Sequence, residues 1–203
     1  MSPEPTTTPA PVATSAPADA RTADPRQQNR GQGGQRQQGR RPKPKSRYGT
    51  QLSEKQNLKN LFGIRDGQLR KYYAQALRVQ GQTGPMLISL LERRLDNAIF
   101  RSGFAQTRPQ ARQMATHRLF AVNGHPVDVP SYELRVGDVV SVRESKRNKS
   151  YFSQFEKRMQ NASTPSWILI NPEEFNFKIQ SLPSFEEANI GVDIRAVLEF
   201  FAH

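Results

Sequence analysis

Arginines recur at short intervals in the middle of this 203-residue chain, and their side chains suit phosphate chemistry. A guanidinium group is a planar fork of N–H donors that matches phosphate oxygens and stacks on bases. Folded RNA is recognised mainly by shape and backbone, so a rigid helical surface with several such groups could bind it. The alternative interpretation is that each arginine is an ordinary solvated surface charge. The candidates in this stretch are Arg94, Arg101, Arg108 and Arg112.

A second set of basic residues flanks the first and includes one tyrosine. Tyr48, beside Arg47, could stack on a base, or it could pack against the edge of a helical domain. His117 and Arg118 end a short predicted helix, whose carbonyl-rich C-terminus also favours a cation. The remaining candidates for contact with RNA are Lys55, Lys59, Arg65, Arg70, Lys71, Lys146, Arg147 and Lys149.

Residue types for other chemistry are absent or poorly arranged. The chain has no cysteine, which excludes disulfides, thiolate zinc sites and cysteine nucleophiles. Its three histidines are scattered without a metal-ligand spacing, so we expect no metal, no cofactor and no catalytic residue. Asp96 lies among arginines and should pair with Arg93 or Arg101 rather than do acid–base work. Tyr72 and Tyr73 fall on an apolar helical stripe, which favours core packing.

Positive charge is concentrated in the middle of the chain. The 30 basic and 18 acidic residues give a net charge of +12, which suggests nucleic acid as the first candidate partner and an anionic membrane as the second. No apolar run approaches the length of a membrane span. Residues 46–150 carry +10, whereas residues 151–203 carry −3. The middle should therefore bind the polyanion, and the acidic end should pack against the first helices or face a protein.

Residues 1–45 differ in composition from the rest. They hold 8 of the 15 prolines and no Phe, Trp, Tyr, Leu or Ile. Such a segment cannot bury enough apolar area to offset its ordering entropy, so we expect a disordered tail. Its basic second half could settle on RNA phosphates, or it could act only as a solubilising tail.

Hydrophobic periodicity predicts the elements that would position these residues in an α+β fold. Ser53 and Gln56 have the spacing of a capping box, which places the first helix start near residue 52. Asn123-Gly124 indicates a tight hairpin turn. The predicted helices run from about 52 to 62, 66 to 79, 83 to 102, 107 to 117, 150 to 161 and 194 to 201. The predicted strands are 119–122, 125–127, 139–143, 167–170 and 175–179.

Several segments in order along the chain carry a family resemblance. Within the middle of the chain they are Arg93–Asn97, Arg101–Ala105, Thr107–Arg112 and Val122–Gly124. These segments closely resemble the RNA-binding module of bacterial ribosomal protein S4. Outside that module, further motifs resemble the same protein's helical domain and its C-terminal part, so the similarity covers about residues 46–203. These motifs are Tyr48–Gln56, Arg70–Tyr73, Gly81–Gly84, Pro165–Trp167 and Asp193-Ile194.

The resemblance implies a particular organisation of the chain. A mainly helical domain would be joined to a small RNA-binding module of two helices packed on a short antiparallel sheet. The expected parts are a tail (1–45), the first part of the helical domain (46–91), the RNA-binding module (92–165) and a C-terminal part that returns to the helical domain (166–203). Many family members carry a cysteine zinc knuckle near the N-terminus, whereas this chain has the tail there.

The resemblance also implies a function. The family's proteins are structural constituents of the small ribosomal subunit that bind its 16S-type RNA, nucleate subunit assembly and contribute to translational accuracy. Ribosomal protein S5 would be a neighbour, with Glu186, Glu187 and Glu199 as the acidic groups that face it. The protein would lie near the channel by which messenger RNA enters the ribosome. The ribosome would be cytoplasmic, and an organelle ribosome is the alternative.

Two other classes of protein carry the same kind of module. Pseudouridine synthases need a catalytic aspartate in a separate large domain, but the net acidic residues after the module hold no phosphate-cradling glycine loop and no nucleophile–base pair. We therefore expect no enzyme. A stand-alone RNA-binding stress or assembly factor would not need the flanking helical domain, and it stays the alternative.

Overall fold

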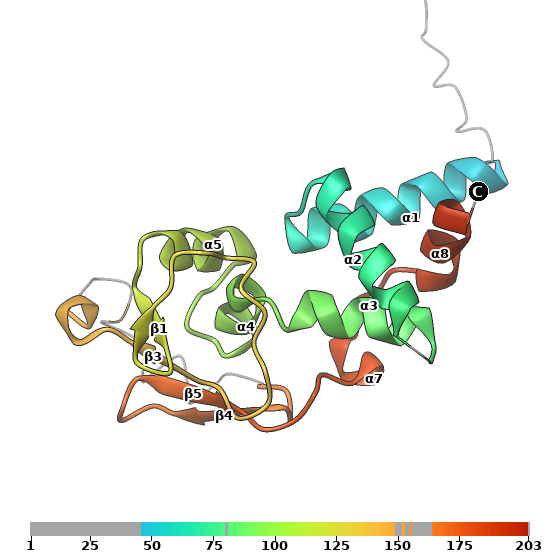
Figure 1. Ribbon diagram of the computed structural model, residues 1–203. Helices are drawn as coiled ribbons and strands as arrows, with labels where there is room; N and C mark the ends of the chain where they lie inside the picture. The colour runs from blue at the N-terminus through green and yellow to red at the C-terminus, as the bar shows by residue number, and fades with distance from the viewer. Residues whose placement is uncertain (1–45, 80, 149–151, 153–154, 156–163, 203) are drawn as a thin grey trace, which may run out of the picture. The chain divides into compact units, whose positions relative to one another are not determined.

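The computed structural model of the chain describes residues 46–79, 81–148, 152, 155 and 164–202 (Figure 1). All of them belong to one compact unit that spans Pro44–His203. The tail predicted for residues 1–45, the candidate Lys149 and most of the helix predicted over 150–161 lie outside the described residues. The predicted α+β class is confirmed, with helices before and after one antiparallel sheet in the sequence.

The predicted elements within the described residues appear in the predicted order, but one predicted helix is divided in two, and the 3-10 turn Glu144–Lys146 and the short helix Phe185–Ala188 were not predicted. The helices are α1 (Arg47–Phe62), α2 (Asp66–Arg78), α3 (Thr83–Glu92), α4 (Leu95–Arg101), α5 (Arg108–Thr116), α7 (Phe185–Ala188) and α8 (Ile194–Ala202). The strands are β1 (Phe120–Val122), β2 (His125–Pro126), β3 (Val139–Val142), β4 (Ile168–Asn171) and β5 (Asn176–Ile179). They form one five-stranded sheet in the order β2-β1-β3-β5-β4.

Helix α1 begins earlier than predicted. Ser46 is its N-cap, and the Oγ of Ser46 accepts a hydrogen bond from the backbone N–H of Gly49 at 3.1 Å. The prediction of a start near Ser53 was wrong because the first turns are polar and show no apolar stripe. Contacts with α8 hold these turns, and Gln51 Nε2 donates to Glu199 Oε2 at 2.8 Å.

The predicted third helix is two helices, α3 and α4. The chain breaks at Arg94, whose backbone is extended (φ −66°, ψ 140°) and forms an antiparallel bridge with Glu133. The backbone N–H of Leu95 then donates to the carbonyl of Tyr132 at 2.9 Å, a partner outside the helix. A segment distant in sequence thus takes hydrogen bonds that a continuous helix would have kept, and apolar periodicity cannot reveal this.

Two apolar cores support the elements. One is formed by residues of α4, α5 and the sheet, and its centre is Phe104, whose ring centroid lies 4.3 Å from that of Phe155. Phe152 and Trp167 belong to the same core. The expectation that the acidic end packs against the first helices holds for Phe201, which packs against the other core, but not for Phe152, Phe155 and Trp167, because β4 and β5 extend the sheet and these residues are buried there. The other core joins α1, α2 and α3 to α7 and α8.

A buried lysine ties three helices together. The side chain of Lys55 in α1 is 7% exposed, and its Nζ lies 2.9 Å from Asp66 Oδ1 at the start of α2. The same Nζ lies 4.2 Å from the ring centroid of Phe200 in α8, a cation–π distance. Lys55 is therefore a structural residue, and its predicted contact with RNA does not fit this burial.

The Asp66→Asn variant tests this ion pair through pH. The hydrogen bond from Lys55 is the largest influence on the pKa of Asp66 and, with Arg70, outweighs burial, so this pKa is lowered. Such a carboxylate stabilises the fold above its unfolded pKa of about 3.9, and this contribution is lost as the pH falls through the folded pKa. We expect Asp66→Asn to lower the melting temperature at about pH 7 and to flatten its decrease between about pH 4 and pH 2. Parallel pH profiles of the two proteins would contradict this.

Candidate nucleic-acid interface

A cleft of about 390 Å³ lies where the C-terminal end of α1 and the start of α2 approach α4 and α5. It brings together three of the predicted RNA-binding residues, Arg65, Arg108 and Arg112, which come from separate parts of the sequence. Asn60, Leu61, Phe62, Gly63, Asp96 and Pro109 complete its lining. A concave surface with several guanidinium groups is suited to bind an anionic backbone.

Arg108 is held at the cleft with part of its donor edge unused. Its guanidinium carbon lies 4.5 Å from the ring centroid of Phe100 and 5.2 Å from that of Phe62. Its Nε donates to Asn97 Oδ1 at 2.9 Å. Burial lowers the pKa of Arg108, but a guanidinium group remains protonated at neutral pH. Its two terminal nitrogens have no hydrogen-bond partner among the described residues, so they can donate to a ligand.

Arg112 joins α5 to the turn that ends α1. Its side chain is 40% exposed, and Nη1 donates to the carbonyl of Gly63 at 2.8 Å. Gly63 has φ +60°, a left-handed conformation that glycine adopts without strain, and it caps the helix. The confirmed helix end at Gly63 therefore also supplies an acceptor that orients Arg112. The same Nη1 lies 3.9 Å from Asp96 Oδ2.

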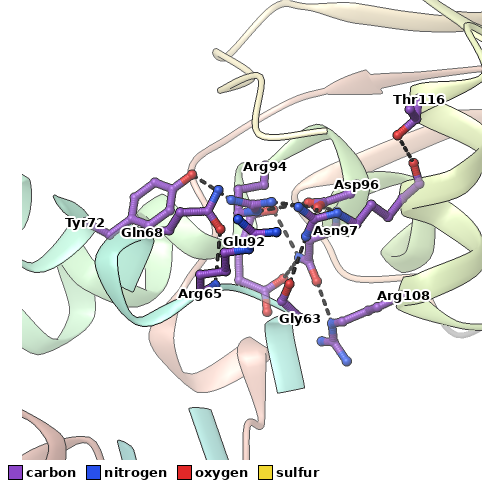
Figure 2. Close-up of polar contacts among 11 residues, drawn as sticks. Gly63, Arg65, Gln68, Tyr72, Glu92, Arg94, Asp96, Asn97, Arg108 and Thr116 are labelled. Atoms are coloured by element: carbon purple, nitrogen blue, oxygen red, sulfur yellow. Dashed lines mark hydrogen bonds and ion pairs between the residues drawn. The ribbon is translucent and has the colours of Figure 1, made fainter. Parts of the chain in front are cut away.

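Arg94 is buried beside Asp96 of the cleft lining, so its guanidinium does not face a ligand in this structure. It is 1% exposed, and its Nε and Nη2 donate to the two carboxylate oxygens of Asp96 at 3.0 and 2.6 Å (Figure 2). Its Nη1 donates to Tyr72 Oη at 2.8 Å. Burial alone would lower the pKa of Arg94, but the hydrogen bonds and charge of Asp96 outweigh it and raise that pKa. Asp96 thus pairs with Arg94, not with Arg93 or Arg101 as predicted.

Arg101 is also committed inside the protein. Its Nε and Nη2 donate to the carboxylate of Glu92 at 2.9 and 2.7 Å, and Nη2 donates to the carbonyl of Ala188 at 2.6 Å. Glu92 is fully buried. Arg93 Nη2 forms an ion pair with Glu133 Oε1 at 3.0 Å. Lys55, Arg94 and Arg101 therefore do not present their charges to RNA in this structure, because each is largely buried and bound to an acidic side chain of the protein, Asp66, Asp96 and Glu92 respectively.

The other candidates lie outside the cleft. Tyr48 is 63% exposed, with its ring centroid 5.7 Å from that of Phe200, so one edge packs while the rest is open. Arg118 donates to Asp128 Oδ2, and this hydrogen bond lowers the pKa of the aspartate. Arg147 lies over the Phe175 ring. The exposed or half-buried candidates that remain are Arg47, Lys59, Arg70, Lys71, His117 and Lys146.

Two of the glutamates expected to face another protein are exposed and also accept hydrogen bonds within this chain. Glu199 Oε2 accepts hydrogen bonds from Arg47 at 2.9 Å and from Gln51 at 2.8 Å. Glu187 Oε1 accepts one from the hydroxyl of Ser166 at 2.6 Å. Counting acidic residues in the sequence could not show these internal contacts.

Within the described ranges, no helix is long and apolar enough to cross a membrane, and no group of His, Asp or Glu side chains has the geometry of a metal site.

The Arg94→Met variant tests the buried pair. Removing the guanidinium leaves the Asp96 carboxylate buried without its main partner, which typically destabilises a protein by about 3–5 kcal/mol. We expect a loss of that size in the free energy of unfolding, measured with urea. The matched control is Arg78→Met, at an exposed position, which should change stability by no more than about 0.5 kcal/mol. Equal stabilities of the two variants would contradict the role given to Arg94.

The family models and the relatives that match this chain belong to ribosomal protein S4 or its domains. The family model of the S4 domain matches residues 93–140, and that of the ribosomal protein S4/S9 N-terminal domain matches residues 15–92. Small ribosomal subunit protein uS4 of Herpetosiphon aurantiacus is 42% identical over 159 residues, which are 77% of this chain and 75% of that protein. The uS4 protein of Sulfurihydrogenibium sp. is 43% identical over 82% of this chain and 81% of its own length. That of Corynebacterium glutamicum is 37% identical over 82% and 83%.

Proposed function

The chain belongs to the uS4 family of small ribosomal subunit proteins, as its motifs predicted, and we propose that it binds small-subunit RNA through the cleft of α1, α2, α4 and α5. It is a structural constituent of the ribosome and not an enzyme. The observation that supports the cleft is Arg108, whose anchored guanidinium leaves two terminal nitrogens for phosphate. Arg65 and Arg112 line the same concavity.

The electrostatics of the cleft favour an anion. Asp96 is the carboxylate in its lining, and Arg94 neutralises it from within the protein. The positive charges of Arg65, Arg108 and Arg112 are therefore available to phosphate. The wider proposed RNA-binding set adds Arg47, Tyr48, Lys59, Arg70, Lys71, His117, Arg118, Lys146, Arg147 and Lys149.

The finer assignments rest on the family resemblance. They are primary binding to 16S-type RNA, nucleation of subunit assembly and a contribution to translational accuracy in a cytoplasmic ribosome. The neighbour would be ribosomal protein S5, near the channel by which messenger RNA enters. We also propose the division into a tail (1–45), the first part of the helical domain (46–91), an RNA-binding module (92–165) and a C-terminal part that returns to the helical domain (166–203). The shared core of α1, α2, α3, α7 and α8 supports this return, whereas β4 and β5 of the C-terminal part belong to the sheet and core of the module.

Salt dependence tests the cleft. With on the order of five phosphate contacts, the slope of log K against log salt should lie near −4. We expect Arg65→Gln and Arg112→Gln each to weaken binding of small-subunit RNA about tenfold and to reduce the slope by about 0.7–0.9. The control is Arg195→Gln, an exposed position on α8 outside the cleft, which should change neither quantity. Cleft variants that behave like this control would contradict the proposal.

Arg118 offers a second test because its backbone is strained. It has φ +55° after α5, a left-handed conformation that costs a residue with a side chain about 1 kcal/mol more than glycine. Arg118→Gly and Arg118→Ala remove the same cation and the same contact with Asp128. We expect equal losses of RNA affinity, while the glycine variant is more stable than the alanine variant by about 1 kcal/mol. Unchanged RNA affinity in both variants would remove Arg118 from the interface.

A further inference from the structure

We propose that Asn97 is a positioning residue that fixes the orientation in which Arg108 meets RNA. This inference rests on the proposed function, since it presumes that Arg108 contacts phosphate. Asn97 was not among the candidates that the sequence indicated. It is 2% exposed, so it does not itself reach a ligand in this structure.

The side-chain amide of Asn97 uses both of its ends. Its Nδ2 donates to Glu92 twice, to Oε2 at 2.7 Å and to the backbone carbonyl at 3.1 Å (Figure 2). Its Oδ1 accepts the Nε–H of Arg108 at 2.9 Å. Its backbone N–H donates to Asp96 Oδ1 at 2.9 Å, which ties it to the buried pair.

These partners allow only one orientation of the amide. Glu92 presents two acceptors, which require the NH₂ group, and Arg108 presents a donor, which requires the oxygen. A flipped amide would place its oxygen against a carboxylate and its NH₂ against a guanidinium. Asn97 therefore presents an acceptor to Arg108 permanently, without any ligand.

The anchor behind Asn97 is rigid. Glu92 is fully buried at the end of α3, and Arg101 of α4 donates two hydrogen bonds to its carboxylate. Arg101 also donates to the carbonyl of Ala188 in α7. The acceptor offered to Arg108 is thus fixed by three helices.

The consequence for Arg108 is preorganisation. The guanidinium carbon lies over the rings of Phe62 and Phe100, which restrain it, and Asn97 accepts the hydrogen bond from its Nε. The terminal nitrogens are the remaining part of the fork, and two parallel bonds from such a fork match a phosphate. A side chain that is already ordered loses less entropy when the ligand binds.

A double-mutant cycle tests the proposal with the full-length protein and small-subunit RNA. We expect Arg108→Gln to weaken binding about tenfold and to reduce the salt slope by about 0.7–0.9. Asn97→Ser should weaken binding in the same direction. The double variant should bind within about twofold of Arg108→Gln alone, because Asn97 acts only through Arg108. Each affinity is referred to the folded fraction, which is measured by thermal unfolding.

The outcomes separate the two hypotheses. If Arg108→Gln changes neither the affinity nor the slope, the proposed RNA site at the cleft fails. If Arg108→Gln weakens binding but the two losses multiply in the double variant, or Asn97→Ser has no effect, the positioning role is overturned while the site stands. The matched control is Ser102→Ala, a buried residue beyond the end of α4 whose hydroxyl donates to the Ile99 carbonyl. It should lower stability without changing RNA affinity.

A second measurement decides the matter if Asn97→Ser does not fold. NMR of the unmodified protein measures the rate at which each arginine Nε–H exchanges with solvent. We expect a much slower rate for Arg108 than for Arg78, which is exposed. Slow exchange in the free protein supports a preformed bond to Asn97. Exchange as fast as that of Arg78 overturns the proposal.

Discussion

The ion pair between Arg94 and Asp96 is the interaction on which the described structure depends. A buried guanidinium and a buried carboxylate are tolerated only when each meets the other with good geometry and further hydrogen bonds, and here both conditions hold. The pair forms because the chain stops being helical at Arg94, which turns its side chain toward Tyr72 of α2. The same backbone break therefore separates α3 from α4, allows the bridge to Glu133 and places Asp96 in the cleft lining.

The same arrangement sorts the arginines into two groups. Arg94 and Arg101 neutralise Asp96 and Glu92, so these acidic groups do not repel an anion at the surface. Arg108 and Arg112 then make only single hydrogen bonds within the described protein and lie at the cleft. An RNA-binding surface built this way keeps its positive field while the charges beneath it are balanced.

Much of the fold could be predicted from the sequence because the signals were local. The apolar stripe in α2, the end of α1 at Phe62 and the Asn123-Gly124 turn depend on neighbouring residues, and all three appear where predicted. The failures came from contacts across the fold. The start of α1 depends on α8, the break at Arg94 depends on the segment near Glu133, and the burial of Lys55 depends on Asp66 and Phe200. Asn97 was missed because a single amide between Asp96 and Ala98 gives no periodic signal.

If RNA occupies the cleft, a cleavage probe attached there will cut it close to the site. The chain has no cysteine, so Asn60→Cys provides a unique site in the cleft lining for an iron chelate that generates hydroxyl radicals. Leu169→Cys, at an exposed position on β4, provides the comparison. We expect strong, localised cleavage of small-subunit RNA from residue 60 in the complex and weaker cleavage from residue 169. RNA that stays uncut from residue 60, in a complex shown to have formed, would contradict it.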